Sequence, residues 1–79
     1  MTIELVNKIT ILKELLEKRN NKSFVFFNKL LDELSNGFVN EAVDSIVTSY
    51  AIVQYGNFTY QEETLFSEIW NIAKKIENK

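Results

Sequence analysis

The sequence predicts an all-α domain, a small antiparallel bundle of four short helices that spans residues 1–79 as a single unit. Three observations support this prediction. A chain of 79 residues allows one small domain and no more. Apolar residues recur at steps of three and four along most of it, which is typical of helices with one buried face. Signals made of Asn and Gly then divide the chain into four segments.

The first helix is predicted over residues 2–20. Its apolar stripe consists of Leu5, Ile9, Leu12 and Leu16. The pair Asn20-Asn21 ends it, because Asn tolerates the left-handed backbone conformation that closes many helices. The second helix starts after Ser23 as a candidate N-cap. Its stripe consists of Phe27, Leu30, Leu31 and Leu34.

Asn36-Gly37 stops the second helix, with Gly at the position that most often takes a positive φ. The third helix is predicted over residues 39–55, where apolar residues keep helical spacing as far as Gly56. The fourth opens at Thr59, because Thr59 and Glu62 have the spacing of a capping box. Its stripe consists of Leu65, Phe66, Ile69, Trp70, Ala73 and Ile76.

A β-hairpin is the alternative for residues 46–60. This stretch is rich in β-branched and aromatic residues, and it alternates around Gly56-Asn57, a pair that favours hairpin turns. An isolated hairpin is marginally stable and no other segment offers a third strand. The helical interpretation is therefore preferred.

The composition excludes several classes of function. The chain contains no His and no Cys, so it has no imidazole base, thiol nucleophile, zinc finger or haem ligand. With 2 Gly it cannot build a glycine-rich phosphate loop. The acidic pairs lie at helix starts or point in different directions, and none requires an active site. We therefore expect no enzyme activity, no cofactor and no metal.

The apolar runs are too short for a membrane span. The longest uninterrupted runs are four residues, whereas a transmembrane helix needs about 20. No N-terminal apolar stretch is long enough for a signal peptide. We therefore expect a cytoplasmic protein.

The charges are segregated along the chain. No Lys or Arg occurs between Lys29 and Lys74, and this interval holds seven acidic residues. They are Asp32, Glu33, Glu41, Asp44, Glu62, Glu63 and Glu68. One interpretation is an ordinary solvated face. The other is a surface that attracts a basic partner, such as a nuclease, whose own surface is built to hold phosphates. Direct binding of nucleic acid by this chain is disfavoured by the same distribution.

The segment from residue 44 to residue 69 resembles small helical immunity proteins of bacterial toxin systems. It is similar in outline to the Maf-type family and to immunity proteins of contact-dependent inhibition. The resemblance rests on the turn Gly56-Asn57-Phe58, an acid at Glu62 or Glu63, and the run from Leu65 to Ile69. It implies binding and neutralising a cognate toxin, often a nuclease, in the cytoplasm. Pediocin-type immunity proteins are a second helical group of this size, and they act with a membrane receptor.

The favoured function is therefore an immunity protein that binds a basic toxin. The alternative is a homodimeric helical regulator or adaptor without a toxin partner. Ten aromatic residues on a small domain favour association, so a homodimer is expected. Two tyrosines with polar tips are predicted as anchoring rings, and six acids as electrostatic contacts. The predicted partner-binding residues are Asp32, Glu33, Glu41, Asp44, Tyr55, Tyr60, Glu62 and Glu63.

Overall fold

The computed structural model describes residues 2–77. Five helices make up the fold, and no strand occurs among the described residues. They are α1 (Thr2–Lys18), α2 (Phe24–Ser35), α3 (Val39–Val47), α4 (Ile52–Tyr55) and α5 (Tyr60–Glu77). The predicted all-α class is confirmed, and the first, second and last helices lie close to where the sequence places them. No helix within residues 2–77 combines the length and the apolar character needed to cross a membrane.

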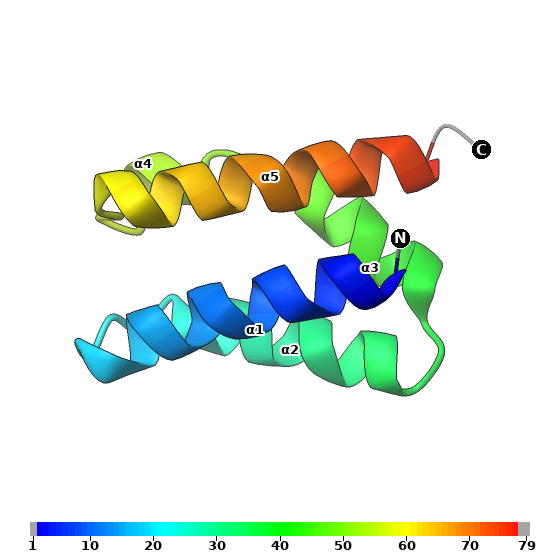
Figure 1. Ribbon diagram of the computed structural model, residues 1–79, viewed down its shortest axis with the longest axis horizontal. Coiled ribbons are helices and arrows are strands. Elements are labelled where there is room, and N and C mark those ends of the chain that lie inside the picture. Colours follow the sequence, from blue (N-terminus) through cyan, green and yellow to red (C-terminus); the bar gives the residue numbers. More distant parts are fainter. Residues whose placement is uncertain (1, 78–79) are drawn as a thin grey trace.

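The four longer helices form a closed ring of contacts. Helix α1 packs against α2 and α5, and α3 packs against the same two helices from the other side. Figure 1 shows that α1 runs antiparallel to both α2 and α5, while the shorter α3 is inclined to them. The molecule measures 34 × 21 × 18 Å. Helix α1 begins and α5 ends at one end of the long axis. The loops 19–23 and 56–59 lie at the other end, called the loop end below.

The core is built from the predicted stripes. All four predicted core residues of α1 are fully buried. Phe27 of α2 and Phe66 of α5 are the largest buried side chains, and their rings meet edge to face with centroids 5.9 Å apart. Phe58, from the loop before α5, extends this contact, with its ring centroid 6.5 Å from that of Phe66. The remaining buried apolar residues are Leu30, Leu34, Ala42, Val43, Ile46, Ile69, Ile72 and Ala73.

The ends of α1 and α2 confirm the predicted stop signals. Asn20 follows α1 with a φ of 60°, and the Asn21 N–H donates to the Leu16 carbonyl at 2.8 Å. Gly37 follows α2 with a φ of 84°, and the Phe38 N–H donates to the Glu33 carbonyl at 2.8 Å. Both arrangements are Schellman motifs, in which a left-handed residue lets later N–H groups reach carbonyls of the last helical turn.

The predicted third helix over residues 39–55 is wrong in its second half. Helix α3 ends at Val47, and the short α4 follows after a turn. The Thr48 hydroxyl donates to the Asp44 carbonyl at 2.8 Å, a local bond that competes with regular helix geometry. The Val47 carbonyl accepts a hydrogen bond from the indole Nε1 of Trp70 at 3.3 Å. A side chain of α5 thus satisfies a carbonyl that a continuing helix would have used.

The hairpin alternative for residues 46–60 is also wrong, because this stretch contains α3, α4 and the start of α5. The predicted capping box of α5 is confirmed. The Thr59 N–H donates to Glu62 Oε1 at 2.8 Å, and the Glu62 N–H donates to Thr59 Oγ1 at 3.2 Å. Ser23 precedes α2 as predicted, although its side chain makes no capping hydrogen bond.

Candidate protein-binding surface

The structure divides the predicted partner-binding residues into two groups. Asp32 and Glu33 lie in the last turn of α2, and Glu41 and Asp44 lie on α3. The last turn of α2 lies at the end of the molecule opposite the loop end (Figure 1). Tyr55, Tyr60, Glu62 and Glu63 lie on α4 and the first turn of α5, at the loop end. The eight residues therefore do not form one surface.

Within the first group, three carboxylates are exposed and one is not. Asp32, Glu41 and Asp44 are exposed, as a solvated acidic surface requires. Glu33 is half-buried, and its Oε1 is enclosed without a hydrogen-bond partner among the described residues. Three of the four carboxylates in this group are therefore exposed, one fewer than the sequence predicts.

Glu62 is the main correction to the predicted site. Its relative exposure is 2%, so it does not take part in an exposed acidic surface. Arg19, at the end of α1, donates from Nε to Glu62 Oε2 at 2.8 Å and from Nη2 to Glu62 Oε1 at 2.6 Å. This paired geometry suits the planar fork of a guanidinium. The charge of Glu62 is therefore neutralised inside the fold.

The ionisation of both groups reflects this contact. The hydrogen bonds from Arg19 hold the pKa of Glu62 below its ordinary value near 4.5, with a further contribution from the Thr59 N–H, while burial opposes the shift. The pKa of Arg19 is raised, mainly by the same hydrogen bonds to Glu62. Both groups are consequently charged at neutral pH, and the pair is a structural element.

Two residues of the α1–α2 loop tie the α4–α5 loop in place. Arg19 Nη2 also donates to the Asn57 carbonyl at 2.7 Å, and Asn21 Nδ2 donates to the Gly56 carbonyl at 2.6 Å. The Asn21 Oδ1 accepts from the Ser23 N–H at 2.9 Å, which orients the amide. These contacts hold the position of α4 at the loop end, although α4 itself buries no residue fully.

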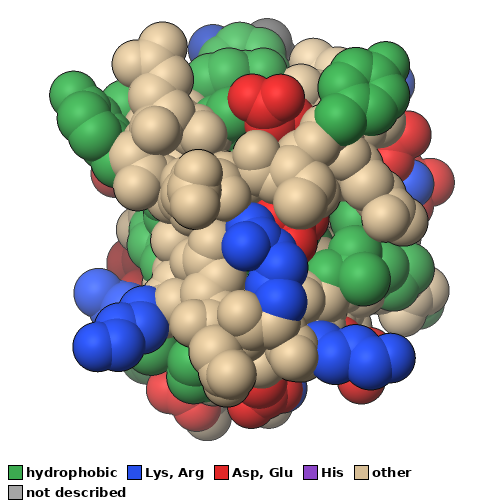
Figure 2. Space-filling model, turned by 90° about the vertical axis from the view of Figure 1, so that its left-hand side faces the viewer, with side chains coloured by type: hydrophobic (Ala, Val, Ile, Leu, Met, Phe, Trp, Pro, Cys, Tyr) green, Lys and Arg blue, Asp and Glu red, His purple; other side chains and the backbone are tan. Residues whose placement is uncertain are grey.

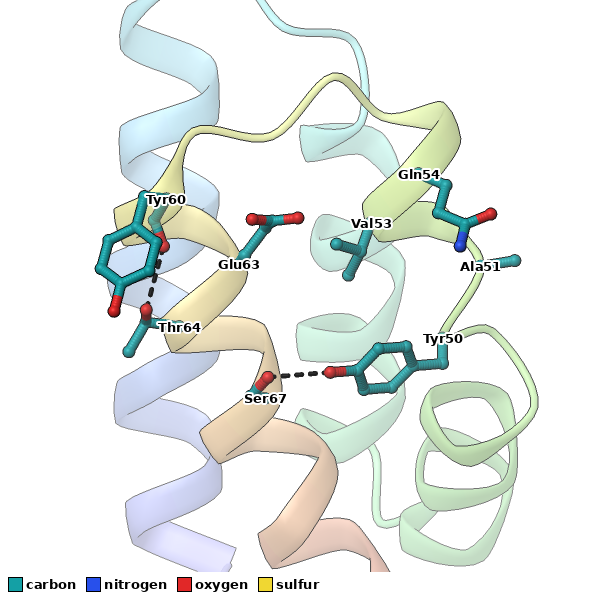
Figure 3. Close-up of a pocket in the computed structure, with 8 residues that line it drawn as sticks. All are labelled: Tyr50, Ala51, Val53, Gln54, Tyr60, Glu63, Thr64 and Ser67. Carbon is teal, nitrogen blue, oxygen red and sulfur yellow. Dashed lines mark hydrogen bonds between the residues drawn. The ribbon is translucent and has the colours of Figure 1, made fainter.

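A groove of about 630 Å³ lies between α4, the turn before it, and the first half of α5 (Figure 3). Apolar and uncharged polar side chains make up most of its lining, and Glu63 is the only charged residue among them within the described part of the chain. The Glu63 side chain points from α5 toward α4 (Figure 3). The lining residues are Tyr50, Ala51, Val53, Gln54, Tyr60, Glu63, Thr64 and Ser67.

Tyr50 forms a fixed wall of this groove. Its hydroxyl shares a hydrogen bond of 2.9 Å with Ser67 Oγ. Its ring meets those of Phe66 and Trp70 edge to face, with centroids 5.5 and 5.6 Å away. Tyr50 is not among the predicted partner-binding residues, although it shares with Tyr55 and Tyr60 a polar tip near the Gly56-Asn57 turn. Its fixed orientation depends on α5 residues 16 to 20 positions later in the chain. Its helical spacing in the sequence resembles that of a core residue.

Tyr55 and Tyr60 project from the loop end into solvent, each with a relative exposure of 84%. The Tyr60 ring lies on the side of α5 that faces away from α4 (Figure 3). Both tyrosines belong to a stretch of the sequence, residues 45–61, that contains no Lys, Arg, Asp or Glu. At the centres of protein–protein interfaces tyrosine is enriched and charged residues are depleted.

Figure 2 shows the loop end from outside. Lys and Arg side chains gather in the half formed by α1 and α2, whereas hydrophobic side chains protrude in the half formed by α4 and α5. The two halves of this face therefore differ in chemistry. The tyrosines and the groove belong to the half that presents apolar surface.

No protein-family model, curated protein or solved structure matches the chain. The surface combines two exposed tyrosines, a groove with one carboxylate, and uncharged polar groups around them.

Proposed function

We propose that this protein is a stoichiometric protein inhibitor, an immunity protein that binds and neutralises a basic toxin, such as a nuclease, in the cytoplasm. The observation that carries the proposal is the pair of tyrosines beside the groove, Tyr55 and Tyr60. Each is 84% exposed on a domain whose core residues are otherwise well buried. Tyrosine is enriched among the residues that dominate binding energy at protein interfaces.

The charge distribution supports a basic partner. Glu63 lies in the groove, and Asp32, Glu41 and Asp44 add exposed negative charge on α2 and α3. Carboxylates outside the contact surface accelerate the encounter with a positively charged protein more than they add affinity. A nuclease, with a surface built to attract phosphates, has the complementary charge.

The test is co-expression with the protein encoded beside this chain's gene in its source genome. The wild type is expected to form a one-to-one complex with that protein and to block its toxicity. The double variant Tyr55→Ala/Tyr60→Ala should weaken the complex by roughly 30-fold or more, since two anchoring rings are lost. The control is Val25→Ala/Phe38→Ala, which removes two exposed apolar residues of α2 and the loop after it, outside α4 and α5 and 60% and 54% exposed. A complex that both double variants weaken equally would contradict the proposed surface, and toxicity unaffected by the wild type would contradict the function.

A homodimeric regulator or adaptor is the second candidate, and the outer face of α1 favours it. Ile3 and Ile11 are 77% and 49% exposed there. Ile11 also lines a shallow hollow of about 350 Å³ together with Glu14, Leu15 and Lys18. Glu14 and Lys18 carry opposite charges, which suits a two-fold contact between copies. Sedimentation equilibrium should then give a dimer at micromolar concentration that Ile11→Ser dissociates, and a monomer at high concentration would exclude this candidate.

A further inference from the structure

The three acids in the first half of α5 have different surroundings. Glu62 pairs with Arg19, and Glu68 pairs with Lys8, whose Nζ lies 3.1 Å from its Oε1. Glu63 forms no ion pair among the described residues, and it is the one that points into the groove. Its carboxylate therefore faces a surface that the chain's own cations leave unneutralised.

We propose that the groove between α4 and α5 binds an arginine side chain of the protein partner, with Glu63 pairing the guanidinium and Tyr50 and Val53 contacting the methylene stem. This inference deepens the proposed function, because it assigns the recognition chemistry of the same surface. The groove then provides specificity beside the two exposed tyrosines.

The walls of the groove fit the long stem of such a residue. Tyr50 presents a ring held by Ser67, Phe66 and Trp70, so its orientation is set before anything binds. Val53 lies across from Glu63 and packs partly against the core. A rigid aromatic wall with a carboxylate nearby favours a cation with an apolar stem, which gains both ring contact and charge pairing.

The electrostatics favour a cation in this place. Residues 45–61 contribute no charge, and no Lys or Arg occurs between Lys29 and Lys74. An incoming guanidinium therefore meets no cation from α3, α4 or the first half of α5. Its planar fork can also take both carboxylate oxygens at once, as Arg19 does at Glu62 in this same fold.

A second copy of this chain is a poor source of the arginine. The sequence contains a single Arg, Arg19, and it is already engaged with Glu62 and the Asn57 carbonyl. Withdrawing Arg19 would leave a buried carboxylate without its partner, at considerable cost. The occupant is therefore a different protein.

The test uses N-acetyl-arginine-N-methylamide as the probe, titrated into the isotope-labelled full chain and followed by two-dimensional NMR. We expect saturable shifts centred on the amides of Val53, Glu63 and Ser67. The neutral isostere N-acetyl-citrulline-N-methylamide should leave them nearly unchanged. Glu63→Gln should weaken the probe roughly two- to fivefold, the range for an exposed charge pair. Glu41→Gln, an exposed carboxylate in the first turn of α3, is the matched control and should change nothing at the groove.

Three results would overturn the proposal. The first is that the citrulline analogue shifts the same amides as strongly as the arginine probe. The second is that the arginine probe shifts the amides around Glu41 as strongly as those around Glu63. The third is that the groove amides shift with protein concentration alone, which would assign the groove to a second copy. The citrulline comparison needs only the wild type, so it decides even if Glu63→Gln folds poorly. No toxin enters this experiment, so a failed co-expression test and a failed probe titration are separate results.

Discussion

Glu62 is the only buried charged side chain among residues 2–77. It closes the capping box of α5 and also holds the end of α1 through Arg19. One carboxylate thus joins two segments 43 positions apart in the sequence. A carboxylate removed from water stabilises the fold only where hydrogen-bond donors satisfy its oxygens. For Glu62 the Thr59 N–H and the Arg19 guanidinium supply these donors.

This contact predicts a loss of stability in acid. The pKa of Glu62 is below its ordinary value in the folded state, so its contribution is fully present above the unfolded pKa near 4.5. It is lost as the pH falls from there through the lowered folded pKa. Urea denaturation from pH 6 to pH 2.5 should show this decline, and Glu62→Gln should remove part of the slope. Glu68→Gln, which alters an exposed pair, should keep the wild-type slope. Equal slopes for wild type and Glu62→Gln would contradict the assignment.

The two glycines are required for different reasons. Gly56 has an ordinary negative φ, but a Cβ there would lie 2.6 Å from the Ile52 carbonyl oxygen and 2.6 Å from the Phe58 ring. Gly37 has open space around it and a φ of 84°.

We therefore expect Gly56→Ala to lower the free energy of unfolding by about 1–3 kcal/mol, through the clash with backbone and ring. Gly37→Ala should cost about 1 kcal/mol, through backbone strain alone. Urea denaturation of the two variants measures both effects. A Gly56→Ala variant as stable as the wild type would mean that the Phe58 ring moves aside freely.

At the scale of elements, the sequence predicts what depends on neighbours along the chain. The stripe of α1, the left-handed Asn20 and the Thr59–Glu62 box are all local patterns. The break after Val47 also involves the indole of Trp70, 23 positions later, and no local pattern indicates that contact.

The same reasoning applies to the candidate surface. Tyr55 and Tyr60 were predicted from their place beside a turn, and they are exposed. Glu62 was predicted as an electrostatic contact because it belongs to the acidic interval between Lys29 and Lys74. Its partner Arg19 comes from a distant helix end, and the groove exists only because α4 lies beside α5. Both features are tertiary and had no signal in the local sequence.

Helix α4 should be the least protected helix against hydrogen exchange. It has four residues and none is fully buried, so local opening exposes its N–H groups at little cost. NMR exchange should show its amides exchanging faster than those around Phe66 and Ile69 of α5. Asn21→Ala, which removes the bond to the Gly56 carbonyl, should speed α4 exchange further. Asn36→Ala removes an exposed bond to the Asp32 carbonyl and should leave α4 unchanged. Protection of α4 equal to that of α5 would show that the loop end opens only with the whole fold.

At the scale of the molecule, stability depends on a small core. A domain of this size rarely has more than about 3–5 kcal/mol available from a single core. Phe66 lies at the centre of its aromatic part and contacts the rings of Phe27, Tyr50 and Phe58. Through its contact with Tyr50, Phe66 therefore joins the core to the wall of the groove.

Phe66→Ala should unfold the protein at room temperature, because deleting a buried ring costs about 3–5 kcal/mol. Circular dichroism should show most of the helical signal lost. Phe38→Ala, at a ring that is 54% exposed, should lose less than about 1 kcal/mol and keep the spectrum. A folded Phe66→Ala variant would mean that the core has more reserve than its size implies.

The placement of the helix ends has a consequence for attaching this protein to other objects. Helix α1 begins and α5 ends at the same end of a 34 Å axis (Figure 1). The end of α4 and the start of α5, which carry Tyr55 and Tyr60, lie at the other end. A fused domain, a tag or a sensor surface joined at the start of α1 or at the end of α5 would therefore lie at the end opposite the tyrosines. Copies immobilised at either helix end would point the loop end away from the attachment point.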